Sequence, residues 1–112
     1  MQVQATAKYL RLSPRKARLI FHGLRGKSVE QALITLQFTP QPGAKDVAKV
    51  VSSAAANAEN NYNMALDDLR IHAIYAGDAR TLKRYKAAAR GRVREILRRT
   101  CHITVIVTDD QE

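Results

Sequence analysis

The stretch RTLKRYKAAARGRVREILRR, residues 80–99, decides how this chain folds. It contains nine Lys or Arg residues and one acid, a net charge of +8 in a protein whose total is +9. Propensity alone favours a helix here, because Ala, Leu, Lys and Arg are good helix formers. Gly91 interrupts such a helix, however, and the apolar positions form only a partial stripe.

The segments on either side favour a different shape. Residues 69–76 alternate in polarity and residues 101–107 are rich in β-branched side chains, and both patterns are typical of strands. Pairing them antiparallel places the midpoint near residue 89, within AAARG, so the stretch between them would form a long hairpin. Ten residues per arm at roughly 3.3 Å each would reach about 30 Å beyond the sheet. On these residues alone, helix and hairpin both remain open.

Alternating polarity predicts a further strand near the start of the chain, in QVQATAKYLRL, residues 2–12. The apolar side of this strand holds Val3, Ala5, Ala7 and Tyr9. Ser13 can cap a following helix that begins at Pro14 and has Gly26 as its C-terminal stop. The side of this helix opposite its apolar stripe carries a basic ridge of Arg15, Arg18, His22 and Arg25.

Two more helices are predicted in the middle of the chain. A capping-box pattern at Ser28 and Gln31 begins the first of them, and a Pro- and Gly-containing segment at residues 39–43 ends it. The last helix should run from about Ala44 to about Asn60, with mostly small residues on its inward face. The order of elements is therefore strand, three helices, strand, basic segment, strand.

Positive charge is concentrated in two blocks. Residues 8–27 hold seven Lys or Arg residues and no acid, residues 80–99 hold the second block, and the intervening and final segments are net negative. Two separate basic blocks indicate a polyanionic partner. The alternative is a soluble protein whose surface is merely basic, but an ordinary solvated surface mixes positive and negative charges. The candidate RNA-binding residues are Lys8, Arg11, Arg15, Lys16, Arg18, Arg25, Lys27, Lys83, Arg84, Lys86, Arg90, Arg92, Arg94, Arg98 and Arg99.

Other kinds of site have little support in the sequence. The three histidines are scattered, and Cys101 and His102 would point to opposite faces of a strand, where they cannot form a catalytic pair. No metal-ligand spacing or phosphate-binding loop is present, so neither catalysis, a metal nor a cofactor is expected. The single cysteine indicates a reducing compartment, and no window is apolar enough to span a membrane. Tyr85 can either stack on a base or pack against the other arm of a hairpin.

Three blocks of sequence resemble a known family. LSPRKARLIFHGLRGKSVEQAL (12–33), KVVSSAAANAENN (49–61) and TLKRYKAAARGRVREILRRTCHITVIV (81–107) resemble the bacterial-type family of large-ribosomal-subunit protein number twenty-two. The resemblance implies an α+β fold in which three helices pack on a small three-stranded antiparallel sheet, with a long protruding basic β-hairpin. It implies one domain over residues 1–112, with the hairpin at about 78–100.

The resemblance also implies a function. Such a protein is a structural constituent of the large subunit that binds its ribosomal RNA, supports early assembly and lines the nascent-peptide exit tunnel with its hairpin. The tip would comprise Ala87, Ala88, Ala89, Arg90, Gly91 and Arg92, although Ala87-Ala88 stand where the family commonly has Pro-Arg. Expected partners are this RNA, neighbouring ribosomal proteins and the nascent polypeptide, with no membrane and no homo-oligomer.

Two further interpretations compete with this one. A free-standing basic RNA- or DNA-binding module would show the same charge pattern. A membrane-surface protein is disfavoured because residues 80–99 lack a continuous apolar face. The expected location is the cytoplasm, within the ribosome, and an organelle-encoded chain would look alike.

Overall fold

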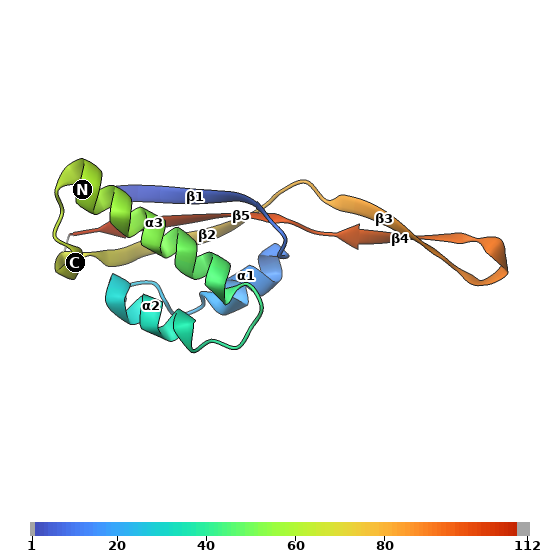
Figure 1. Cartoon of the computed structure of the whole chain (residues 1–112), viewed down its shortest axis with the longest axis horizontal. Helices are drawn as coiled ribbons and strands as arrows, with labels where there is room; N and C mark the ends of the chain where they lie inside the picture. The colour runs from blue at the N-terminus through green and yellow to red at the C-terminus, as the bar shows by residue number, and fades with distance from the viewer. Residues whose placement is uncertain (1, 110–112) are drawn as a thin grey trace.

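The computed structural model describes residues 2–109, which form an α+β body from which a two-stranded ribbon extends (Figure 1). The helices are α1 (Pro14–Ile20), α2 (Val29–Gln37) and α3 (Ala44–Tyr62). The strands are β1 (Gln2–Leu10), β2 (Arg70–Asp78), β3 (Leu82–Ala87), β4 (Val93–Arg98) and β5 (Cys101–Thr108). Short 3-10 turns at Leu66–Asp68 (η1) and Ala89–Gly91 (η2) precede β2 and join β3 to β4.

The body is built on a three-stranded antiparallel sheet of order β1-β5-β2, with the helices on one face (Figure 1). Helix α3 packs across β1 and β5, α1 packs against β2, and α2 packs on α3. The centre of the core is filled by branched side chains from β5 and α3, including Ile103, Val105, Val47 and Val51. The three predicted helices and the three-stranded antiparallel sheet are therefore confirmed.

Helix α3 lies close to the sheet because its inward face is made of small residues. Ala54, Ala55 and Ala58 are buried, as the sequence predicts, and a larger side chain at these positions would push the helix away. The helix runs two residues past the predicted end at Asn60. It stops at Asn63, whose left-handed backbone lets its N–H donate to the carbonyl of Ala58.

Helix α1 is shorter than the sequence predicts. It ends at Ile20, six residues before the predicted stop at Gly26. Phe21 caps the helix, and Gly23 follows with a φ of 86°, a conformation in which a side chain would be strained, so the helix cannot continue to Gly26. His22 and Arg25 therefore lie in the connection to α2, and their assignment to a helical ridge is wrong.

This connection covers the outer edge of β2. The N–H of Gly26 donates to the carbonyl of Ile71 (2.8 Å), and the N–H of Ile71 donates to the carbonyl of Lys27 (2.9 Å). One step further, the N–H of Val29 donates to the carbonyl of Leu69 (3.1 Å). An edge strand that would otherwise present unpaired backbone groups is thereby closed.

Irregular pairing in β1 and β2 turns two tyrosines away from the core. The register between β1 and β5 shifts between Ala7 and Leu10, and Tyr9 has a positive φ of 58°. The register between β2 and β5 shifts between Ile71 and Ala73, after which Ile74 and Ala76 face the core. An extra residue reverses which side chains face inward. The alternation in sequence groups Tyr9 with Val3 and Ala5, and Tyr75 with Ile71 and Ala73, on the apolar side of each strand. For the two tyrosines this prediction is wrong, because they are 61% and 58% exposed.

Residues 82–98 form two antiparallel strands, so the helix alternative for the basic stretch is wrong. Figure 1 shows this ribbon leading away from the body, and the molecule measures 62 × 25 × 20 Å. Two hydrogen bonds join ribbon and sheet: the N–H of Ala79 donates to the carbonyl of Thr100 (3.2 Å), and the hydroxyl of Thr100 donates to the carbonyl of Arg80 (2.6 Å).

Candidate nucleic-acid interface

The ribbon has two chemically different faces, because cross-strand partners in an antiparallel pair project to the same side. One face combines the pairs Leu82 with Arg98, Arg84 with Ile96, and Lys86 with Arg94. Four of these six side chains are cations, all of them exposed. We call Arg84, Lys86, Arg94 and Arg98 the basic face.

The opposite face of the ribbon is mainly apolar. It combines the pairs Lys83 with Leu97, Tyr85 with Glu95, and Ala87 with Val93, and its two charges are of opposite sign. Tyr85 is 66% exposed, which leaves its ring free to stack on a flat ligand. The high net charge of the ribbon is thus directed largely to one side and to its tip.

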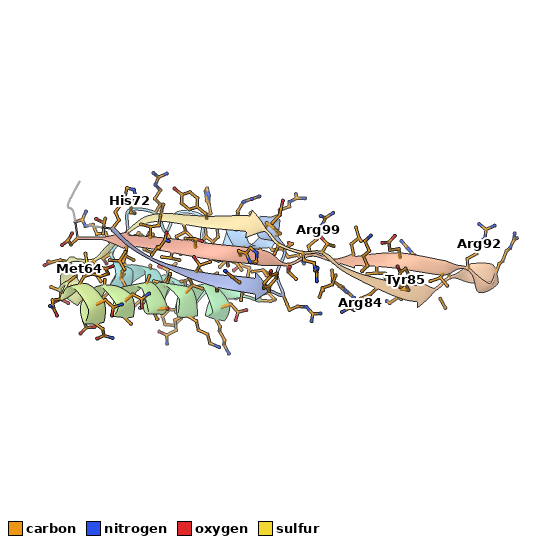
Figure 2. The ribbon with its side chains drawn as sticks, turned by 90° about the horizontal axis from the view of Figure 1, so that it is seen from above. Met64, His72, Arg84, Tyr85, Arg92 and Arg99 are labelled. Atoms are coloured by element: carbon orange, nitrogen blue, oxygen red, sulfur yellow. The ribbon has the colours of Figure 1, made fainter. Side chains whose placement is uncertain are left out.

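The tip of the ribbon is a tight turn of Ala88–Arg92. The N–H of Ala88 donates to the carbonyl of Arg92 (2.6 Å), and Arg90 and Gly91 both take positive φ angles. Figure 2 shows Arg92 at the far end, with Arg99 where the ribbon meets the body. Ala87 pairs with Val93 and belongs to β3, so the turn begins one residue later than the predicted tip.

Two cations of the first basic block have a structural task. The Arg18 Nη2 atom donates to the carbonyl of Ala76 (2.9 Å), and the Arg25 Nε atom donates to the carbonyl of His72 (3.2 Å). Both carbonyls belong to β2, so these arginines fasten α1 and its following connection to the sheet. Their remaining N–H groups still face outward, since both residues are exposed overall.

The two basic blocks, far apart in sequence, meet where the ribbon joins the body. Arg11 from the connection between β1 and α1 and Lys16 from α1 line the same pocket as Arg98 and Arg99 from the end of the ribbon. All fifteen predicted RNA-binding residues are exposed. Those outside the ribbon and the pocket lie on β1, α1 and the connection between α1 and α2: Lys8, Arg15, Arg18, Arg25 and Lys27.

Sequence reasoning missed the exposed uncharged residues of this pocket. Leu19, Gln41, Pro42 and Leu97 line it beside the cations. Leu19 falls outside the apolar stripe of α1, and this was the one signal in the sequence that it is available to a partner. The others come from separate elements, so that only the fold brings them together.

Cys101 and His102 lie on opposite sides of β5. Cys101 is buried in the core, whereas His102 accepts a hydrogen bond at Nδ1 from the N–H of Tyr9 (3.0 Å) and meets the Tyr9 ring edge-on. Burial raises the pKa of the Cys101 thiol, and the positive charge of Arg18 opposes this effect. Residues 2–109 contain no group of three or more acidic, His or Cys side chains able to hold a metal ion.

We expect alkylation of Cys101 by iodoacetamide at pH 8 to be far slower in the folded protein than in denaturant. The thiolate is the reactive form, a raised pKa lowers its fraction, and burial blocks the reagent. Glu59→Cys supplies an exposed thiol on α3 in the same molecule as a matched control. Mass spectrometry of the time course should show one fast and one slow site. Equal rates would contradict the buried placement.

None of the helices within residues 2–109 is long and apolar enough to cross a bilayer.

Comparison with known proteins gives a consistent assignment. Residues 5–108 match the model of the family described as Ribosomal protein L22p/L17e. The chain is 49% identical over 111 residues to large ribosomal subunit protein uL22 of Desulfitobacterium hafniense, covering 99% of this chain and 97% of the relative. It is 51% identical over 109 residues to uL22 of Dehalococcoides mccartyi, covering 97% and 100%. The uL22 protein of Clostridium novyi is 46% identical over 109 residues, covering 97% and 98%.

The α+β body and the outward-facing cations thus belong to a ribosomal protein. The chain is a member of the Ribosomal protein L22p/L17e family, of the bacterial uL22 type. It is a structural constituent of the large ribosomal subunit rather than an enzyme, and it acts within the ribosome, in the cytoplasm. Its partners in that assembly are ribosomal RNA and other ribosomal proteins.

Proposed function

We propose that this protein binds large-subunit ribosomal RNA chiefly through phosphate contacts along the ribbon and the adjoining body. The observation that carries the proposal is the basic face, where four cations lie on two short paired strands. Arg and Lys release condensed counterions when they neutralise phosphates, which gives affinity without sequence preference. The guanidinium fork of arginine adds paired hydrogen bonds to phosphate oxygens.

The ribbon acts in this proposal as a protruding arm that RNA surrounds during assembly. A two-stranded ribbon has no core of its own and is marginal in water, and its positive charges repel one another. RNA packed along the basic face would remove that repulsion and order the arm. The arm would in turn hold separate RNA segments together, and this supports a role early in subunit assembly.

The far end of the arm reaches the wall of the nascent-peptide exit tunnel in this proposal. Support comes from the family resemblance and from the shape, since the tip lies farthest from the body (Figure 1). Arg90 and Arg92 would meet RNA there, and the nascent polypeptide would pass beside them. The protein serves as one copy per subunit, because RNA and neighbouring proteins occupy its surfaces.

Crosslinking from the tip tests the tunnel assignment. Arg92→Cys carries a benzophenone maleimide at the tip. Glu59→Cys carries the same group in the C-terminal half of α3, at the end of the body far from the ribbon (Figure 1). Buried Cys101 does not compete for the reagent. In large subunits holding a stalled peptide, the tip should crosslink to RNA and to the peptide, and the control should miss the peptide. A tip that never reaches the peptide would refute the tunnel assignment.

A further inference from the structure

A pocket of about 820 Å³ lies where the ribbon joins the body. It is bounded by α1 and the residues just before it, by the connection between α2 and α3, and by the end of the ribbon at Leu97–Arg99. Its volume is within the range of ordinary small-ligand sites. Three parts of the chain that are distant in sequence therefore build one concave site.

The rim of this pocket is strongly positive. Arg11, Lys16, Arg98 and Arg99 line it, and none of the described residues around it is acidic. All four cations are exposed, so their charges are available to an incoming anion. A phosphate-bearing ligand is the chemical complement of such a rim.

The lining of the same pocket is also partly apolar, which phosphate contacts alone do not require. Leu12 and Ile20 line it as buried side chains, whereas Leu19 and Leu97, 67% and 48% exposed, and Pro42 are accessible to a ligand. Gln41 adds an amide that can both donate to and accept from the edge of a ring. The combination suits a ligand with a charged backbone and a flat, apolar body with polar edges.

We infer that this pocket receives one unstacked nucleotide of the RNA, with its base over Leu19, Pro42 and Leu97 and its flanking phosphates on the four cations. The inference rests on the proposed RNA binding and adds a site that reads RNA structure. Specific RNA recognition commonly uses bases splayed out of bulges and loops, which side chains can cover and whose edges they can read. The phosphate contacts of the ribbon carry no such information.

The test uses two RNA duplexes of about 16 base pairs, one fully paired and one with a single unpaired adenosine. The intact protein should bind the bulged duplex about tenfold more tightly, which is within the range of one base stacked on protein. A double variant, Leu19→Ser with Leu97→Ser, should lose that preference and keep its affinity for the paired duplex. Ile34→Ser with Phe38→Ser, exposed apolar residues in α2 and directly after it, outside the pocket, is the matched control and should keep the preference.

A second measurement makes the test independent of how well the variants fold. With 2-aminopurine in the bulge, the fluorescence of this base should change when the intact protein binds the bulged duplex. Adding an excess of fully paired duplex to the labelled RNA in place of the protein should not produce this change. Equal affinity of the intact protein for both duplexes, with no fluorescence change, would overturn the pocket and leave the proposed RNA binding standing. Binding to neither duplex would overturn the proposed function as well. Capture of an acidic, leucine-containing peptide by the pocket, with no bulge preference, would assign it to a protein partner.

Discussion

A loss of about 250- to 1000-fold in RNA affinity is expected when the salt concentration rises from about 50 to about 200 mM. Each neutralised phosphate contributes about −0.7 to −0.9 to the slope of log affinity against log salt. About six such contacts give a slope of about −4 to −5, which a fourfold rise in salt converts into the stated loss. Filter binding or fluorescence anisotropy at a series of salt concentrations measures this slope.

The basic face supplies the matched comparison for this prediction. Replacing Arg84, Lys86, Arg94 and Arg98 together by Gln removes four candidate contacts, so the slope should become shallower by about 3. Lys83→Gln, on the opposite face, should change it by less than about 1. A slope near −1 in the intact protein, or equal slopes in the two variants, would rule out binding dominated by phosphates on this face.

Ile103→Ala should destabilise the body by about 2–5 kcal/mol. Ile103 lies in the central strand β5, is fully buried and faces the helices, so its removal leaves a cavity that the packed core cannot close. Denaturant unfolding followed by circular dichroism gives the free energy of unfolding. The loss should appear in the midpoint with little change in the slope against denaturant.

Ile106→Ala on the same strand is the control for this core prediction. Ile106 is only partly buried, on the sheet face away from the helices, so the same chemical deletion should cost less than about 1 kcal/mol. Equal losses for the two variants would show that the sheet faces are packed alike, contrary to the structure.

Local signals sufficed for most of the body. Ser13 and Ser28 begin their helices as predicted, because each hydroxyl accepts a hydrogen bond from the N–H three residues on, at 3.3 and 3.2 Å. The alanine-rich stripe of α3 is buried as its spacing predicts. These features depend on neighbouring residues alone, which is why the sequence reveals them.

Features that depend on pairing with distant residues were harder to predict. The orientations of Tyr9 and Tyr75 follow from bulges, which cannot be seen in the alternation of one strand. Helix α1 ends before Gly23, although Gly26 is an equally suitable stop in the sequence. The helix ends early because residues 26–29 must pair with β2. Such choices are made by the sheet edge rather than by helix propensity.

The candidate site divides in the same way. Charge clustering selected fifteen cations that are all exposed in the structure, because charge needs no fold to be counted. It could not show that Arg18 and Arg25 also hold β2, nor that the ribbon separates its charges from Tyr85 and Val93. The pocket at the junction combines three segments, so no single stretch of sequence contains its pattern.

The ribbon has a consequence for the protein before it meets RNA. β3 and β4 form a two-stranded sheet, so within the described residues each strand has one edge open to a strand of another molecule. The exposed side chains of Tyr85, Val93 and Leu97 would favour pairing of a strand from another molecule with this open edge, and such pairing leads to aggregation. Two like-charged arms repel each other, so the same arginines and lysines that suit the ribbon to RNA keep newly made copies apart. Variants neutralised on the basic face should therefore be handled at low concentration, since they lose this protection along with their charge.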